Sequence, residues 1–372
     1  AGVALASLML AILSGNTGRQ GIVRQPASGR HCMDSRHGLK EPGRENIWPV
    51  AAIIALAHGK ASLQYALLTQ PMAHIGRQDM TALNDGWFTE VFQDQGTAFS
   101  LQVKKKLHEE QTPFQKLEIY ETETFGNLMV LDGCVMLTTR DNFLYHEMMT
   151  HPALFTHRDP KKVVIVGGGD CGTLKEVLKH PGVEEAWQVE IDERVTRMSE
   201  KYFPELCEAN SDPRANFFFG DGIQWMRDIE PNSVDLIIID STDPVGPAEG
   251  LFALDFYRDA MLALREGGII VQQSESPLLH TDSIIKGIHE DMRKAGFEHV
   301  QTMPFPQPVY PTGWWSCTMA SKENPIKYFR EEDANNRPFV TRYYNSGVHH
   351  GALAMPQFMV DALEDEVRPE EG

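Results

Sequence analysis

The segment Val234-Asp-Leu-Ile-Ile-Ile-Asp-Ser-Thr-Asp-Pro-Val-Gly-Pro247 decides how the rest of the chain can be interpreted. Its run from Leu236 to Ile239 is apolar and rich in β-branched residues, which predicts a strand buried on both faces. The turn-forming residues that follow cannot continue this strand. Because open α/β sheets bind ligands at the carboxyl ends of their strands, Asp240 and Asp243 are candidate ligand-binding residues. Two solvated turn aspartates are the alternative.

Strand-like and helix-like segments alternate on both sides of this segment. Apolar runs at 163–166, 186–191, 215–219 and 268–272 are each followed by a helical pattern, and two further strands are expected near 298–303 and 314–320. This alternation predicts an α/β fold with a doubly wound, mainly parallel Rossmann-like sheet, of the kind found in class I methyltransferases. We place this catalytic domain at residues 141–365, beginning with a helix that Asp141 or Asn142 can cap.

A different pattern precedes this domain. Strand-like runs occur at 87–91, 97–103, 114–121 and 127–131, and Phe125-Gly126 and Asp132-Gly133 are turn sequences. An Asp-Gly pair beside apolar runs is a strong hairpin signal. The pattern predicts a small antiparallel β domain at residues 80–140.

The first 79 residues differ in charge from the rest. They hold 8 Lys+Arg and 4 Asp+Glu, whereas the whole chain has a net charge of −18. Their apolar stretch at 3–13 is too short to span a bilayer and lacks the basic residues of a signal peptide. We interpret residues 1–79 as a disordered or loosely structured extension outside the working enzyme, with Met80 as a candidate natural start. Residues 366–372 form an acidic tail.

Composition limits the function of the protein. A net charge of −18 over 372 residues argues against a nucleic-acid-binding protein. The apolar content is that of an ordinary globular protein, and no membrane association is expected. The five cysteines contain no Cys-x-x-Cys pair, which is typical of reduced thiols in a cytoplasmic protein without a zinc site. No His, Cys and Asp residues have metal-ligand spacing, so we expect no metal ion.

The first strand of the catalytic domain ends in a glycine-rich loop. Gly167, Gly169 and Gly172 satisfy the G-x-G-x-x-G pattern of dinucleotide-binding proteins, and Glu190 follows about twenty residues later. Asp170, however, places a carboxylate where a pyrophosphate would bind the helix N-terminus, and the two anions would repel each other. The loop therefore favours a cationic nucleoside without phosphate, such as an S-adenosyl sulfonium compound.

Acidic residues end the next strands as well. Glu190 is placed to accept hydrogen bonds from the ribose hydroxyls, and Asp221 from the adenine amino group. Ordinary strand-end acids are the alternative, but three in succession point to one ligand site. Asp240 and Asp243, at the fourth strand end, would then lie beside the sulfonium. There they could bind a polyamine and remove a proton from its attacking nitrogen.

Eight segments together resemble one family. They are 167–170 (Gly-Gly-Gly-Asp), 189–192 (Val-Glu-Ile-Asp), 220–222 (Gly-Asp-Gly), 240–247, 87–90 (Trp-Phe-Thr-Glu), 131–133, 145–148 (Tyr-His-Glu-Met) and 310–313 (Tyr-Pro-Thr-Gly). In these segments the chain is similar to the spermidine synthases, which are polyamine aminopropyltransferases, and the segments 342–345 (Arg-Tyr-Tyr-Asn) and 354–357 (Ala-Met-Pro-Gln) resemble the bacterial type. The resemblance extends over about residues 84–365. Cys171 departs from it, because many relatives have glycine there, and we interpret Cys171 as a small packing residue.

The resemblance implies a reaction and a set of site residues. Decarboxylated S-adenosylmethionine, a co-substrate rather than a cofactor, would react with putrescine to give spermidine and 5′-methylthioadenosine, and the enzyme would be a homodimer or homotetramer. The implied catalytic residues are the proton acceptor Asp240 and the nearby Tyr145. The implied polyamine contacts are His146, Asp170, Asp243 and Tyr310. The implied donor contacts are Gln102, Gly167, Glu190, Asp221, Gly222 and Pro247.

Other functions compete with this interpretation. A putrescine N-methyltransferase would have to tolerate the donor carboxylate near Asp170, and a different polyamine could replace putrescine as acceptor. A nicotinamide oxidoreductase is disfavoured by Asp170. A module that only binds a nucleoside or polyamine would not need the full set of acids.

Overall fold

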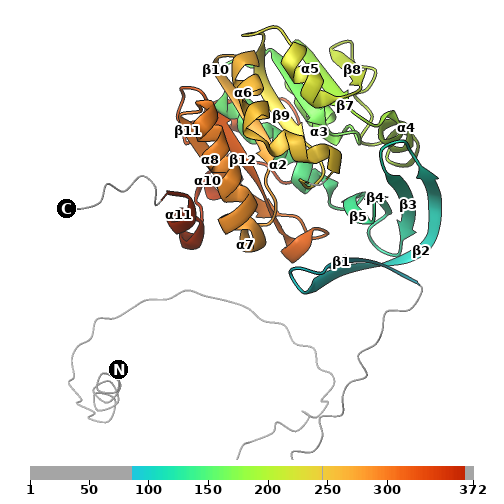
Figure 1. The fold of residues 1–372 in the computed structure, drawn as a ribbon. Helices are drawn as coiled ribbons and strands as arrows, with labels where there is room; N and C mark the ends of the chain where they lie inside the picture. Colours follow the sequence, from blue (N-terminus) through green and yellow to red (C-terminus); the bar gives the residue numbers. More distant parts are fainter. Residues whose placement is uncertain (1–85, 245, 365–372) are drawn as a thin grey trace, which may run out of the picture. The chain divides into compact units, whose positions relative to one another are not determined.

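The computed structural model describes residues 86–244 and 246–364 (Figure 1). The predicted extension 1–79, with its candidate start at Met80, and the predicted acidic tail 366–372 lie outside these residues.

The described chain begins with an antiparallel sheet of five strands in sequence order. They are β1 (Trp87–Phe92), β2 (Thr97–Gln111), β3 (Lys116–Thr122), β4 (Asn127–Leu131) and β5 (Cys134–Thr138). At the turn between β4 and β5, Asp132 and Gly133 both have positive φ, at 49° and 89°. Two positive φ values in a two-residue hairpin turn are what the Asp-Gly pair favours. The antiparallel fold of this region was thus correctly predicted.

A seven-stranded sheet follows, in the order β11-β12-β10-β9-β6-β7-β8. Strands β10, β9, β6, β7 and β8 are parallel, and β12 is antiparallel to both of its neighbours. The prediction of a doubly wound, mainly parallel sheet is therefore confirmed. The strands are β6 (Lys162–Gly167), β7 (Glu185–Glu190), β8 (Ala215–Phe219), β9 (Val234–Asp240), β10 (Leu264–Gln273), β11 (His299–Pro306) and β12 (Trp314–Ser321).

The order of the strands identifies where a ligand should bind. The chain runs from β6 outward to β7 and β8, and then returns to β9 on the other side of β6. The strand order therefore reverses between β6 and β9. In open α/β sheets the crevice at such a reversal, outside the carboxyl ends of the strands, is the usual ligand site.

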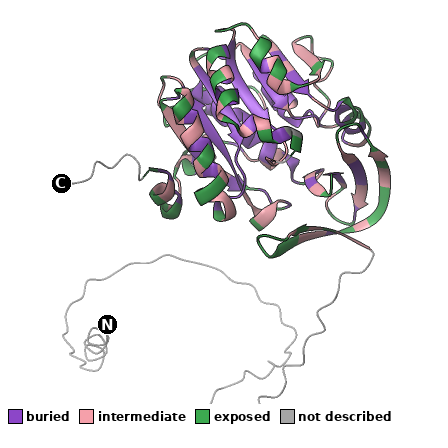
Figure 2. Ribbon diagram, in the orientation of Figure 1, coloured by how far each residue is buried: buried purple, intermediate pink, exposed green. Residues whose placement is uncertain are grey.

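Helices cover both faces of this sheet. Along β9, Leu236 and Ile238 pack in one apolar cluster and Ile237 and Ile239 in the other, so the central strand is buried on both faces, as its sequence predicted (Figure 2). The first cluster includes residues of α2 (Asn142–Thr156) and α3 (Gly172–Leu178). The second includes residues of α5 (Gly222–Asp228), α6 (Leu254–Ala263) and α8 (Lys286–Ala295).

The small sheet is joined to the large domain through α4 (Glu193–Tyr202). Val195 and Met198 of this helix share an apolar cluster with Leu117 of β3 and Met129 of β4. At the edge of the interface, Arg194 forms a bidentate ion pair with Glu110 of β2, at 2.7 and 3.0 Å. This packing holds the small sheet beside the strand ends of β6 and β7.

Helix boundaries differ from the prediction in three places. The Asp141 side chain does not cap α2; its Oδ1 accepts a hydrogen bond from Thr138 at 2.5 Å, and Asn142 donates to the Thr138 carbonyl. A 3₁₀ turn, η3 (Gly246–Phe252), precedes α6, and a π turn, η4 (Thr281–Ile285), precedes α8.

The remaining elements are α7 (Pro277–His280), η5 (Pro311–Gly313), α9 (Glu331–Asn335), α10 (Ser346–Leu353) and α11 (Gln357–Glu364). Among the described residues, no helix has the length and apolar character needed to cross a membrane.

Candidate active site

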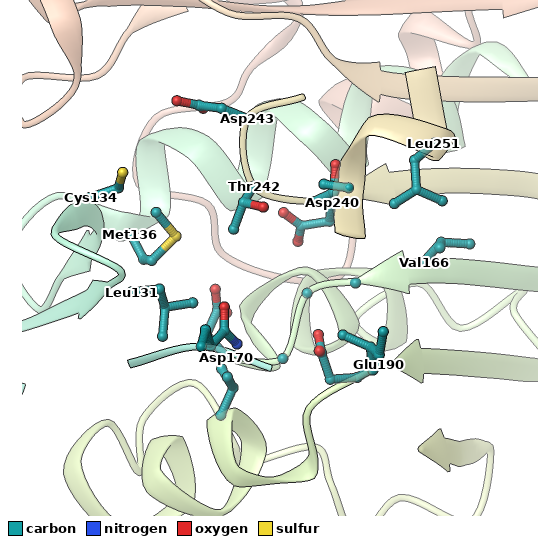
Figure 3. A pocket seen from close by; sticks show the side chains of 18 of the residues that line it. Leu131, Cys134, Met136, Val166, Asp170, Glu190, Asp240, Thr242, Asp243 and Leu251 are labelled. Atoms are coloured by element: carbon teal, nitrogen blue, oxygen red, sulfur yellow. The ribbon is translucent and has the colours of Figure 1, made fainter. Parts of the chain in front are cut away.

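A cavity of about 400 Å³ lies at the strand-order reversal, between the large sheet and β4 and β5. Its volume falls in the range of about 300–1,000 Å³ that is usual for small-molecule sites. Figure 3 shows the carboxylates of Asp170, Glu190 and Asp240 directed into it. Ten of the twelve predicted site residues line this cavity: Tyr145, His146, Gly167, Asp170, Glu190, Asp221, Gly222, Asp240, Asp243 and Tyr310.

The glycine-rich loop after β6 is held against the end of β9. The Gly168 amide donates to the Asp240 carbonyl at 2.7 Å. Gly167 has a φ of +86°, and a Cβ atom there would lie 2.2 Å from the same carbonyl oxygen. A Cβ on Gly172 would lie 2.1 Å from Cε1 of His146. Glycine at these two positions therefore allows the loop, β9 and α2 to meet at the cavity wall.

Asp170 occupies the start of α3. Its Oδ1 accepts a hydrogen bond from the Gly172 amide at 2.6 Å and lies 3.1 Å from Nε2 of His146. The carboxylate thus binds the helix start where a bound phosphate would otherwise be expected. Burial alone would lower the pKa of His146, but the charge and hydrogen bond of Asp170 outweigh it and hold that pKa above its ordinary value.

Asp240 ends β9 and is only 8% exposed. Its Oδ1 accepts a hydrogen bond from Tyr145 Oη at 2.7 Å, and its Oδ2 accepts one from Thr173 Oγ1 at 2.6 Å. Burial, followed by the charge of Asp170, raises the pKa of Asp240. A carboxylate of raised pKa accepts a proton more readily than a solvated one, so this residue is suited to act as a general base.

Glu190 ends β7 and is 7% exposed. Its Oε1 accepts a hydrogen bond from the Asp192 amide at 2.8 Å. Burial, together with the charges of nearby acids, raises the pKa of Glu190 to about 7. Oε2 points toward Gly169, since a Cβ atom on that glycine would lie 2.9 Å from it.

Asp221 follows β8 and caps α5. Its Oδ1 accepts hydrogen bonds from the amides of Ile223 and Gln224, at 2.8 and 3.2 Å. The residue is exposed at the cavity edge. Because the cap uses Oδ1, the other oxygen of Asp221 is the one placed to bind a ligand.

A second, smaller cavity of about 40 Å³ adjoins the first on the side of Asp243. Glu90 of β1, Tyr310 and Trp315 also line it. The Tyr310 hydroxyl donates to the Met136 carbonyl at 2.5 Å, and its ring meets that of Trp315 edge-on, 4.7 Å between centroids. Tyr310 is thus fixed as a wall between the cavities, and Trp315 packs in the core as well as at the site.

Acidic groups gather around this second cavity. Burial, and then the charge of Asp243, raises the pKa of Glu90 to about 7. Burial and the Asp243 charge also hold the pKa of Glu275 well above its ordinary value. Glu90 and Asp243 line this cavity, whereas Glu275 is buried near Asp243 and is not among the described residues that line it. Glu90 and Glu275 are not among the site residues predicted from the sequence. Glu275 follows the end of β10, so it fits the same pattern of acids at strand ends as the predicted residues.

One predicted donor contact needs correction. Gln102 is an exposed residue of β2, paired with Trp87, and is not among the described residues that line the cavity. Gln115, in the turn between β2 and β3, does line it. The Nε2 of Gln115 donates to Asp192 Oδ2 at 3.1 Å, and Thr112 donates to the same oxygen at 2.7 Å. The other predicted residue that is not placed in the cavity, Pro247, has a side chain outside the described part of the structure.

Cysteine and histidine residues do not add a metal centre to this part of the chain. Cys171 is buried in the left-handed region, with a φ of 70°, which is a conformation typical of glycine. His349 is buried against the Phe329 ring. Within the described ranges, no three His, Cys, Asp or Glu side chains are grouped so that they could hold a metal ion.

Comparisons with known proteins agree with this geometry. Residues 142–330 match the spermine/spermidine synthase domain, and residues 86–139 match the spermidine synthase tetramerisation domain. A polyamine aminopropyltransferase of Thioalkalivibrio sulfidiphilus is 64% identical over 277 residues, covering 74% of this chain and 97% of that protein. One of Methylococcus capsulatus is 60% identical over 279 residues, covering 75% and 97%.

Solved structures show the same fold. A spermidine synthase in complex with the transition-state analogue AdoDATO has a TM-score of 0.72 and 35% sequence identity, covering 76% of this chain and 96% of its own. The spermidine synthase of Thermotoga maritima has a TM-score of 0.71, also at 35% identity, covering 76% and 95%.

Proposed function

Because the chain belongs to the spermine/spermidine synthase family, we propose that it transfers the aminopropyl group of decarboxylated S-adenosylmethionine to putrescine. The products are spermidine and 5′-methylthioadenosine. The observation that supports this proposal is the position of Asp240, which is buried in the wall of the larger cavity together with Asp170 and Glu190, while Asp243 lines both this cavity and the smaller one beside it.

The chemical step follows from this arrangement. The neutral amine of putrescine attacks the aminopropyl carbon bonded to the sulfonium, so that a C–N bond forms while the C–S bond breaks. The sulfur keeps the electron pair and leaves as a neutral thioether. The new secondary ammonium then gives its extra proton to Asp240, and Tyr145 holds Oδ1 of that carboxylate during the transfer.

The charge of Asp170 supports a preference for a decarboxylated donor. Asp170, hydrogen-bonded to the start of α3 and close to His146, would pair with the ammonium of the aminopropyl group. The carboxylate that S-adenosylmethionine carries beside this ammonium would face Asp170 and be repelled. Glu190 would accept hydrogen bonds from the ribose, and Asp221 from the adenine. Gln115 lines the same cavity and would contribute to the wall around the nucleoside.

The acceptor site explains the need for a second amine. When one nitrogen of putrescine lies at Asp240, the other extends toward Glu90 and Asp243, which line the second cavity. A bound ammonium would offset the charge of Asp243, which adds to burial in raising the pKa values of Glu90 and Glu275. An acceptor without a second positive charge would lose this interaction.

One assay tests the proposed reaction. The protein is incubated with putrescine and either decarboxylated S-adenosylmethionine or S-adenosylmethionine, and the products are identified by mass. We expect spermidine and methylthioadenosine with the decarboxylated donor only. Methylputrescine from the second mixture would show that the protein is an N-methyltransferase, and parallel reactions with cadaverine and spermidine define the range of acceptors.

The pKa of Glu190 predicts how nucleoside binding depends on pH. Because this pKa is about 7 and the ionised form accepts hydrogen bonds from the ribose, protonation of Glu190 should weaken binding. The Kd of methylthioadenosine is expected to rise by up to about tenfold per pH unit below pH 7, and to be constant above pH 8. Calorimetry between pH 5.5 and 8.5 measures this change.

The variant Glu190→Gln separates this effect from other titrations. It keeps the size of the side chain but cannot ionise, so its Kd should stay nearly constant over the same range and should be higher than that of the wild type at pH 8. A wild-type Kd that does not change with pH would exclude the proposed role of the Glu190 carboxylate.

We further propose that the protein is a cytoplasmic homo-oligomer. The match of residues 86–139 to a tetramerisation domain supports assembly through the small sheet. Cys134, Cys171, Cys207 and Cys317 are free thiols, which suits a reducing compartment. Light scattering of the purified protein measures the subunit number, and a monomer would contradict this proposal.

A further inference from the structure

Thr173 lies in the first turn of α3, directly behind the candidate base. Its side chain is fully buried, and its Oγ1 donates to Oδ2 of Asp240 at 2.6 Å. Thr173 is not among the described residues that line either cavity, so it has no direct route to a ligand. We propose that Thr173 is a positioning residue for aminopropyl transfer, which acts by holding the carboxylate of Asp240. This inference rests on the proposed function.

Two hydroxyl groups hold the carboxylate from two different helices. Tyr145 of α2 donates to Oδ1 at 2.7 Å, and Thr173 of α3 donates to Oδ2 at 2.6 Å. Each carboxylate oxygen can accept about two hydrogen bonds, so one accepting position on each oxygen remains for the amine. Threonine has few χ1 rotamers, which restricts the direction of its donor. The pair therefore fixes the plane of the carboxylate toward the cavity.

The same hydrogen bond adjusts the basicity of Asp240. The titratable groups around this carboxylate are Tyr145 and His146 of α2, Asp170 of the glycine-rich loop, Glu190 of β7 and Tyr310 at the cavity wall. Burial and the charge of Asp170 raise the pKa of Asp240, whereas His146 and the two hydroxyl donors lower it. Without Thr173, the ionised form of the base would lose one of its two hydroxyl donors.

The test compares Thr173→Val, which has nearly the same shape but no hydroxyl, with Thr173→Ser, which keeps the donor. Loss of one hydrogen bond to a charged group should move the acid limb of the kcat–pH profile upward by about one pH unit. On the acid limb, below both pKa values, kcat should fall about tenfold, while the KM for the donor stays within about twofold of the wild type. Thr173→Ser should restore most of the wild-type profile.

Thr150→Val provides a matched control. Thr150 is also fully buried, on α2, but its Oγ1 has no hydrogen-bond partner among the described residues. This variant should leave both kcat and the pH profile unchanged. Melting temperatures of all three variants are measured alongside, because a general loss of structure would lower kcat without moving the acid limb.

The possible outcomes separate the two proposals. The role of Thr173 would be overturned if the kcat–pH profile of Thr173→Val superimposed on that of the wild type. It would also be overturned if the acid limb of Thr173→Ser were shifted as far as that of Thr173→Val. If Asp240→Asn is inactive in the same assay, that result leaves the proposed function in place. If Asp240→Asn retains activity, the proposed function itself fails in its assignment of the base.

Discussion

Replacement of Asp240 with asparagine is expected to lower kcat for spermidine formation by about 100-fold or more, the usual contribution of a general base. The amide is nearly the same size and can still accept hydrogen bonds from Tyr145 or Thr173, so the cavity should keep its shape. It cannot accept the proton that the amine releases. The initial rate of spermidine production at saturating substrates measures this loss.

Asp243→Asn is the matched control for this variant, because it makes the same chemical change three residues along the same segment. Asp243 borders the second cavity with Glu90, so its loss should mainly raise the KM for putrescine. A higher pH should partly rescue Asp240→Asn, since the amine then arrives without its proton. If Asp240→Asn had a near-normal kcat, or if Asp243→Asn lost the same fraction of kcat, Asp240 would not be the base.

Four of the predicted residues that line the cavity share one property. Asp170, Glu190, Asp221 and Asp240 follow the ends of four parallel strands, and the α/β topology brings such ends to one edge of the sheet. A local pattern of apolar strands and polar ends was therefore enough to place them. The same rule extends to Glu275, two residues after the end of β10.

The residues contributed by the small sheet could not be placed in this way. Glu90 and Gln115 reach the cavities because the small sheet packs against the large domain, through α4 and also around Val309. This contact joins segments far apart in the chain, and no periodicity reports it. Gln102 and Gln115 both belong to the β2–β3 region, and alternation alone does not show which of them faces the large domain. Sequence patterns therefore led to Gln102 as the expected nucleoside contact, whereas the structure places Gln115 at the cavity.

The hydrogen bond between Thr173 and Asp240 illustrates the same limit at the level of single atoms. The two residues are 67 positions apart and belong to α3 and β9. The sequence indicates a helix after the glycine-rich loop and a strand ending at Asp240, but the close approach of the two depends on the glycines. Gly167 and Gly168 bring the loop backbone against the Asp240 carbonyl, and this places the first turn of α3 behind the carboxylate.

Asp170→Asn is expected to lower kcat/KM for decarboxylated S-adenosylmethionine by roughly 100-fold. A hydrogen bond between two charged groups contributes about 1.5–3 kcal/mol, and the variant leaves the donor ammonium facing a neutral amide. Asparagine can still accept the hydrogen bond from the Gly172 amide, so α3 should begin as before and the melting temperature should change little. Steady-state kinetics with varied donor concentration measures the change.

The same variant tests how the protein discriminates between donors. In the wild type, the charge of Asp170 attracts an ammonium and repels a carboxylate, whereas asparagine does neither. The affinity for S-adenosylmethionine, measured by calorimetry, should therefore rise in Asp170→Asn while that for the decarboxylated donor falls. Asp221→Asn serves as a control, because Asp221 caps α5 at the proposed adenine end of the site and its loss should weaken both donors alike. If the ratio of the two affinities stayed at its wild-type value in Asp170→Asn, selection against the carboxylated donor would have to arise from the shape of the cavity rather than from this charge.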